Sequence, residues 1–248
     1  MLHTFFFSPS NTTRKYAEVM TEAFGGDSQL IDLTLGAPEV KCDLIDGDTA
    51  LLIAPVYAGR IPGMAAELFK QIDGTGLNAI VAVVYGNRDY DDALLELADI
   101  AAECGFKVVA AGAFIAQHCI FPKVATGRPD ADDIQKAIEF IETAKQSTRL
   151  DISTNKGNRQ YKKPAAVPLH PETVEEDCKA CGICARECPV DAIDAVTLKT
   201  DNDKCISCCR CIAVCNTGAR KFKGIIYSGV EKLFKLQNSK RKEPEIFV

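Results

Sequence analysis

Long apolar runs and a basic N-terminal region are both missing from the sequence. No apolar run approaches the roughly 18 residues that a membrane-spanning helix needs, so we expect no membrane span. Residues 1–7 carry no lysine or arginine ahead of their short apolar stretch, which is unlike a secretion signal. We therefore expect an unexported protein of the cytoplasm.

An excess of positive charge is missing too. The 29 lysine and arginine residues face 34 acidic ones, which gives a formal net charge of -5. Proteins that hold nucleic acid neutralise its phosphates with a surplus of lysine and arginine. The charge therefore argues against DNA or RNA as a partner. The apolar fraction of 47% is that of an ordinary globular protein, so we expect a packed core.

Cysteine, in contrast, is abundant, with twelve residues in the chain. Eight of them form two repeats with the spacing C-x2-C-x2-C-x3-C, and Pro189 follows the first repeat. The first repeat consists of Cys178, Cys181, Cys184 and Cys188, and the second of Cys205, Cys208, Cys211 and Cys215. Without a secretion signal, this spacing favours metal ligands over a disulfide framework.

The cysteine-rich unit, residues 172–224, resembles the bacterial two-cluster ferredoxins. Three cysteines spaced two apart wrap a tight loop around one [4Fe–4S] cube, and in that family the fourth cysteine ligates the other cube. The resemblance implies one cluster on Cys178, Cys181, Cys184 and Cys215, and a second on Cys205, Cys208, Cys211 and Cys188. Structural zinc is the alternative, but zinc takes four ligands and does not call for a third cysteine at this spacing.

Two departures from the ferredoxin pattern occur in the second repeat. Asn216 stands where a second proline is usual, and Cys209 is added between two ligands. Both bear on the local turn and on the reduction potential of the cluster held by Cys215. We expect Cys209 to be an unligated thiol. We expect the remaining cysteines, Cys42, Cys104 and Cys119, to be buried small apolar side chains.

Residues 1–145 alternate β-rich apolar runs with helical patterns, which predicts a doubly wound α/β domain with a parallel sheet. The predicted strands are 2–7, 29–33, 50–56, 79–85 and 107–115, and the predicted helices are 12–24, 62–71, 91–103 and 131–145. Glycine and proline leave 34–48 unassigned. Residues 146–171 are predicted to be a linker. The tail, 225–248, is expected to contain a short amphipathic helix that docks on the protein's own surface.

Hydroxyl and amide side chains follow the first predicted strand. The loop Ser8, Pro9, Ser10, Asn11, Thr12 and Thr13 opens a helix, whose free N–H groups and dipole favour an anion such as phosphate. The loop lacks the glycines and lysine of a Walker A motif, and it is not a G-x-G-x-x-G motif. A hydroxyl cradle suits a terminal phosphate monoester. Simple helix capping is the alternative.

The loops after the third and fourth strands share a second pattern. Each offers an aromatic ring, backbone amides around a glycine, and a cation, which together could hold a flat heterocycle with polar edges. Ordinary solvated turns are the alternative. The residues concerned are Pro55, Val56, Tyr57, Ala58, Gly59 and Arg60 in one loop, and Tyr85, Gly86, Asn87, Arg88, Asp89 and Tyr90 in the other.

With these three loops, residues 1–145 resemble flavodoxin, which implies a five-stranded sheet in the order 2-1-3-4-5 and bound FMN. The resemblance places Ser8, Ser10, Asn11, Thr12 and Thr13 around the phosphate and the other two loops around the ring. Ser8 and Asn11 stand where flavodoxins usually have Thr and Gly. The whole chain resembles the flavodoxin and ferredoxin fusion proteins of anaerobic prokaryotes.

The resemblance implies an electron-transfer protein that passes electrons between FMN and a redox protein partner through two [4Fe–4S] clusters. Two alternatives stay open: a flavin-dependent oxidoreductase that reduces an organic substrate or quinone, and a flavin-free docking module for a ferredoxin. His118, after the fifth strand, could donate a proton at the flavin edge or merely shape its loop. The sequence does not name the partner, and a homodimer is left open.

Overall fold

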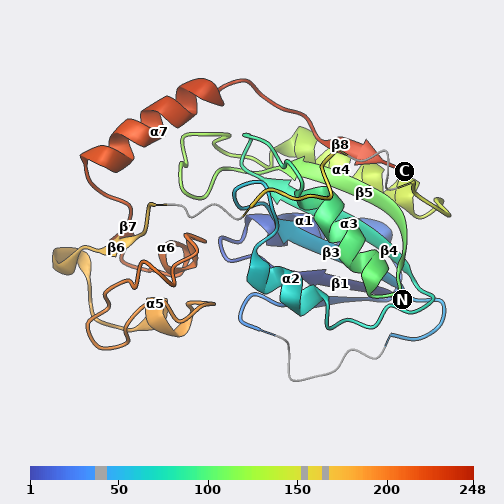
Figure 1. Ribbon diagram of the computed structural model, residues 1–248, viewed down its shortest axis with the longest axis horizontal. Coiled ribbons are helices and arrows are strands. Elements are labelled where there is room, and N and C mark those ends of the chain that lie inside the picture. The colour runs from blue at the N-terminus through green and yellow to red at the C-terminus, as the bar shows by residue number, and fades with distance from the viewer. Residues whose placement is uncertain (37–43, 152–155, 164–167) are drawn as a thin grey trace.

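The computed structural model describes residues 1–36, 44–151, 156–163 and 168–248, and the statements below concern these residues. Cys42, which we expected to be buried, and residues 37–43 of the unassigned segment 34–48 lie outside them. Figure 1 shows an α/β domain beside a smaller cysteine-rich module, with the last helix, α7, running from the module back to the sheet.

The α/β domain is built on a six-stranded sheet in the order β2-β1-β3-β4-β5-β8. β1 to β5 run parallel, and β8 pairs antiparallel with β5. The order of the first five strands confirms the prediction. The strands are β1 (Leu2–Phe6), β2 (Ser28–Asp32), β3 (Thr49–Pro55), β4 (Asn78–Tyr85), β5 (Lys107–Ile115) and β8 (Glu245–Phe247).

Helices cover both faces of the sheet, as the nearly unbroken apolar runs of its central strands require. α1 (Thr12–Phe24) and α4 (Ala131–Ala144) cover one face, where Tyr16, Phe114 and Phe140 are buried together. α2 (Gly63–Phe69) and α3 (Ala93–Glu103) cover the other face. The predicted helices are confirmed to within about two residues at each end.

The edge strand β8 was not predicted. It is three residues long, too short to show an alternating pattern, and it pairs with β5 by bringing Ile246 opposite Gly112. The Tyr90 hydroxyl donates a hydrogen bond to Glu245 at 2.7 Å. β8 thereby covers the β5 edge, which would otherwise present unpaired backbone groups to solvent.

The cysteine-rich module is a small α+β unit, as predicted. β6 (Glu172–Thr173) pairs antiparallel with β7 (Arg220–Lys221), and the short helices α5 (Ile183–Arg186) and α6 (Arg210–Ala213) carry the two cysteine repeats. The two repeats share a feature of their backbone: Ala180 and Ser207, at equivalent positions, both have a left-handed conformation.

The C-terminal segment returns to the α/β domain. α7 (Ile225–Gln237) docks on the loop after β5: the Tyr227 hydroxyl donates to the Ile120 carbonyl at 2.9 Å, and Lys123 pairs with Glu231 at 2.6 Å. A helix is therefore present in the tail and contacts the protein's own surface through Tyr227 and Phe234, whereas Val230 and Leu233 remain 39% and 56% exposed. None of the described helices is both long and apolar enough to cross a membrane.

Candidate functional site

The first three cysteines of the first repeat meet the last cysteine of the second. Cys178, Cys181, Cys184 and Cys215 line one small cavity, whose other walls include Leu198. Cys181 is exposed, while Cys184 is buried. Cys184 and Cys215 are far apart in the sequence. They meet because β6 pairs with β7, which brings the two ends of the module together.

The other four cysteines form a second group. Burial, with smaller effects of the neighbouring thiols of Cys211, Cys188 and Cys205, raises the pKa of the Cys208 thiol to about 12. Cys188 has the same effect on the pKa of Cys205 and of Cys211. Cys188, although it belongs to the first repeat, therefore lies among the first three cysteines of the second repeat.

Backbone amides donate to three of these sulfur atoms. Ala180 N–H donates to Cys178 Sγ at 3.4 Å, and Ser207 N–H donates to Cys205 Sγ at 3.4 Å. A further amide, that of Ala192, donates to Cys188 at 3.3 Å. Such bonds stabilise thiolate sulfur, and around iron–sulfur clusters they help to set the potential.

A buried arginine lies between the two thiol groups. Arg220 is 2% exposed and lines the cavity of the first group, while its Nη2 lies 3.7 Å from Cys211 of the second. The same guanidinium donates to Pro171 and Thr200 at 2.8 and 2.6 Å. These bonds fix a positive charge between two sets of sulfur atoms.

The loop after β1 opens α1 without a side-chain cap from Asn11, which is left-handed at φ 63°. Ser8 instead shapes the loop: its Oγ accepts from the Arg14 amide at 2.8 Å. The hydroxyls of Ser10 and Thr12 lie 3.2 Å apart and face an adjoining cavity. Both hydroxyls thus line a cavity, and the N-cap residue makes no side-chain cap.

Two cavities adjoin at the carboxyl ends of the parallel strands. One, of about 490 Å³, is lined by Ser10 and Thr12, and the other, of about 560 Å³, by Val56 and Tyr57. A narrow cleft that includes Tyr85 and Gly86 connects them. The residues His118 and Cys119 line all three spaces. Ligands of doubly wound folds bind at this end of the sheet.

Some predicted loop residues line these spaces and others do not. Those in the lining are Ser10, Thr12, Pro55, Val56, Tyr57, Ala58, Tyr85, Gly86 and Arg88. The remaining ones are Ser8, Asn11, Thr13, Gly59, Arg60, Asn87, Asp89 and Tyr90.

The residues outside the lining have structural partners. Arg60 pairs with Glu96 of α3 at 2.5 Å, and Asp89 pairs with Lys156 at 2.7 Å. The Asn87 amide donates to the carbonyls of Asn238 and Lys240, so it binds the C-terminal segment. The geometry assigns these side chains to the framework that holds the loops.

The loop after β5 contributes residues that were not among the predicted ligands, notably Gln117 and Cys119. Its sequence has no motif, and its place at the end of the fifth strand was the available signal. His118 Nδ1 accepts from the amides of Ile120 and Phe121, each at 3.2 Å. The proton of the neutral ring therefore resides on Nε2. Burial, with a smaller effect of Arg88, lowers the pKa of His118 to about 4.

Gly86 holds His118 in place by its lack of a side chain. A Cβ at Gly86 would lie 2.6 Å from His118 Cδ2. The imidazole therefore packs directly on the backbone of the loop after β4, and the two loops define one wall together.

The cysteine-rich module covers these cavities. Ile206 and Ser207 line the larger one, and Cys209 and Ile212 line the other. The Tyr57 hydroxyl donates to the Cys208 carbonyl at 3.5 Å. The second thiol group thus lies next to the strand ends, while the first group faces away from them.

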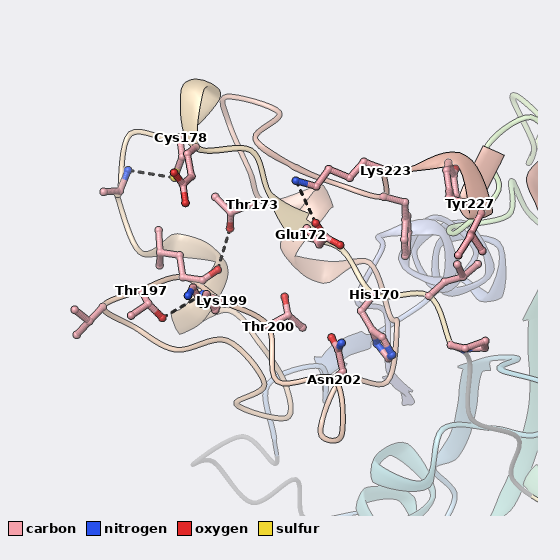
Figure 2. A pocket seen from close by; sticks show the side chains of 18 residues that line it. His170, Glu172, Thr173, Cys178, Thr197, Lys199, Thr200, Asn202, Lys223 and Tyr227 are labelled. Atoms are coloured by element: carbon pink, nitrogen blue, oxygen red, sulfur yellow. Dashed lines mark hydrogen bonds and ion pairs between the residues drawn. The ribbon is translucent and has the colours of Figure 1, made fainter.

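A further hollow, of about 830 Å³, lies within the module and beside α7 (Figure 2). Figure 2 shows the ion pair between Lys223 and Glu172, 3.1 Å apart, at its rim. His170 lines it, and its Nδ1 is buried without a hydrogen-bond partner among the described residues. No residue from the strand ends lines this hollow, so the flavin prediction does not concern it.

Comparisons with known proteins give one family and several similar structures. The 4Fe-4S binding domain family matches residues 171–194, which contain the first cysteine repeat. No curated protein matches the chain.

The similar solved structures include a short-chain flavodoxin associated with a PDU bacterial microcompartment, at 16% identity and a TM-score of 0.44, over 59% of this chain and 98% of that one. A flavodoxin from the domain Archaea has 15% identity and a TM-score of 0.41, over 58% and 99%.

Rubredoxin oxygen:oxidoreductase from Desulfovibrio gigas also has 15% identity, with a TM-score of 0.42, over 58% of this chain. The aligned part spans about a third of that longer enzyme, 35% of its length. Independently of these structures, the parallel strands have the order 2-1-3-4-5, which is that of flavodoxin-like folds. The chain therefore joins a flavodoxin-like α/β domain to a 4Fe-4S binding domain.

Proposed function

We propose that the chain is an electron-transfer iron–sulfur flavoprotein that holds FMN and two [4Fe–4S] clusters. The observation that carries the proposal is the placement of the second thiol group. Its loop covers the cavities at the strand ends, where the Tyr57 hydroxyl reaches the Cys208 carbonyl. A cluster there would lie beside a flavin, as electron transfer between them requires.

The cluster ligands in this proposal are crossed between the repeats. Cys178, Cys181, Cys184 and Cys215 hold one cluster, and Cys205, Cys208, Cys211 and Cys188 hold the other. The cavity shared by the first four thiols supports this assignment. Thiols around a cavity suit a cube better than one zinc ion.

The cavities at the strand ends fit a flavin mononucleotide chemically. Ser10 and Thr12 offer hydroxyls at the N-terminus of α1, where an anion is favoured. Val56 and Tyr57 offer apolar surface at the other end. Hydroxyls for a phosphate and apolar surface for an aromatic ring are thus both available at the strand ends.

A bound flavin would supply two-electron chemistry, and each cluster exchanges single electrons. The protein's own residues place and tune these groups. Tyr57 ties the flavin-side loop to the second repeat, and Arg220 offsets the negative charge of both clusters. Neutral His118 offers an Nε2–H donor within the cavity wall.

The two thiol groups define a route for electrons. Cys181 of the first group is exposed, whereas Cys208 and Cys211 of the second are buried. A redox protein partner would therefore exchange electrons at the first cluster. The second cluster would connect it to the flavin.

The phosphate site can be tested with FMN and riboflavin, which differ by the phosphate. In the Ser10→Ala/Thr12→Ala variant we expect FMN affinity to fall by about tenfold, the effect of losing roughly 1.4 kcal/mol. Riboflavin affinity should stay the same. Thr143→Ala, a change in an exposed hydroxyl of α4, is the matched control. Equal losses for FMN and riboflavin would contradict the phosphate assignment.

A second candidate function is a flavin-dependent reductase of a small molecule. The observation that favours it is the pair of cavities, since each has a volume within the range of roughly 300–1,000 Å³ that is typical of small-molecule sites. One could hold the flavin ring and the other a substrate. Arg88, Lys162 and Lys163 in the larger cavity would favour an anionic one. Turnover of a quinone or organic acid by the reduced holoprotein would establish this activity.

A further inference from the structure

Cys209 occupies a backbone position that favours glycine. It is the N-cap of α6 with φ 63°, and its counterpart in the first repeat is Gly182, the N-cap of α5 with φ 70°. A side chain in the left-handed region costs roughly 1 kcal/mol compared with glycine. The fold uses glycine once at this position and cysteine once, although neither cluster needs a ligand there.

The thiol of Cys209 points away from both clusters and toward the α/β domain. Cys209 is 4% exposed and belongs to a buried apolar group with Ile120 and Phe121, against which Cys119 packs. Cys119 and Cys209 pack in the same group and line the same cavity. Two cysteines that the clusters do not use thus meet across the boundary between the domains.

The pair is reachable from a cavity. Both cysteines line the space of about 490 Å³ that also contains Ser10, and Lys15 lies in the same wall. Cys119 is partly exposed, whereas Cys209 is buried. The more exposed thiol is the one that a small disulfide can reach, and its thiolate is the reactive form.

We infer that Cys119 and Cys209 form a redox-active dithiol that closes into a disulfide between the two domains. The oxidant is a low-molecular-weight disulfide. The more exposed Cys119 thiolate attacks one of its sulfur atoms, the disulfide bond of the small molecule breaks, and one small thiol leaves. The Cys209 thiolate then attacks Cys119 Sγ and releases the second small thiol. Overall, two protein thiols are oxidised to one disulfide and one small disulfide is reduced to two thiols.

The disulfide would join the loop after β5 to the loop of the second cysteine repeat. In the dithiol state these loops are held by apolar packing of Ile120 and Phe121 against Cys209. Oxidation would add a covalent bond at the place where the module covers the strand-end cavities. The pair would thereby couple the redox state of small thiols to the geometry of the route between cluster and flavin.

The test uses the holoprotein, treated without oxygen with oxidised glutathione or with dithiothreitol. After free thiols are blocked in denaturant, the protein is digested and its peptides are analysed by mass spectrometry without reduction. We expect a peptide that links Cys119 to Cys209 after oxidised glutathione and none after dithiothreitol. Its absence in both samples, or equal linkage of cluster cysteines, would overturn the inference.

Three variants control the result. Cys119→Ser and Cys209→Gly should both abolish the linked peptide. Cys104→Ser, which changes a thiol that is hydrogen-bonded to the Phe69 carbonyl, should retain it. Cys209→Gly should also keep the full iron and sulfide content, because it restores the glycine of the first repeat. Loss of iron in that variant would make Cys209 a ligand and contradict the inference. Flavin content does not enter this assay, so the proposed function can fail separately.

Discussion

At the scale of single residues, Arg220 has the greatest expected influence on the clusters. Its guanidinium is buried between the two thiol groups, where a positive charge favours the reduced, more negative form of each cluster. A buried charge of this kind is tolerated because its Nη atoms donate to acceptors such as Pro171 and Thr200, while its Nε has no partner among the described residues.

Arg220→Gln should lower the reduction potentials of both clusters and reduce thermal stability, because the charge and several hydrogen bonds are lost together. Arg220→Lys should restore part of the potential, since it keeps the charge without the planar fork. A redox titration followed by electron paramagnetic resonance measures both effects. Unchanged potentials in Arg220→Gln would contradict the assigned role.

His118 makes a prediction about pH. Its pKa is about 4 in the folded protein and about 6.5 in an unfolded chain, so the unfolded state binds more protons between these values. Stability is therefore lost as pH falls through this window, by about 2 kcal/mol at pH 5. Between pH 8 and pH 5, the stability measured by thermal unfolding should fall more in the wild type than in His118→Asn. Parallel losses in the two proteins would contradict this origin.

Single residues also mark the limit of the sequence prediction. The eight cysteines proposed as cluster ligands and the additional Cys209 can be identified in the sequence by their spacing. The partner of Arg60 cannot be identified in this way. Glu96 lies on α3, and the two side chains meet only because that helix packs beside the loop. A cation after a strand can bind a ligand or brace a loop, and the sequence carries no signal that separates the two.

At the scale of elements, the five parallel strands and four helices were predicted because each is long enough to show its period. β8 was missed because three residues at the end of a charged tail show none. The cavity-lining residues of the loop after β5 were missed for a similar reason. No motif marks them, and only the position of the loop at the strand ends indicates their place.

Phe247 tests the contribution of β8. It packs against the core beside β5, and Phe247→Ala should reduce stability by about 2 kcal/mol, less than a fully buried phenylalanine would. The midpoint of thermal unfolding should fall by about 4–8 °C. Val248→Ala, at a half-exposed position, is the control and should have little effect. Equal effects of the two changes would mean that β8 does not stabilise the sheet.

At the scale of the whole molecule, the crossed repeats are the main structural claim about the clusters. Cys188→Ser should damage the cluster of the later repeat, and Cys215→Ser that of the earlier one. Cys181 is exposed and Cys208 is buried, so the two clusters should lose iron to an external chelator at different rates. The rate measured in each variant therefore identifies the cluster that remains. Loss of the cluster nearest in sequence to each substitution would refute the crossed assignment.

The sequence predicted two domains but not how they face each other. Their arrangement depends on single contacts from distant segments, such as Tyr57 with Cys208 and Tyr227 with Ile120. Neither pair has a sequence pattern, since each joins residues about a hundred or more positions apart. The placement of the second thiol group over the strand ends is therefore a result of the structure, and it is what connects the two cofactor sites.

The central claim is that one chain holds both a flavin and iron–sulfur clusters. The most direct test is to purify the protein without oxygen, release the clusters with acid, and record the ultraviolet and visible spectrum of the supernatant with assays for iron and sulfide. The account predicts FMN together with iron and sulfide from two [4Fe–4S] clusters. Iron and sulfide without flavin, in a protein that added FMN does not restore, would contradict it.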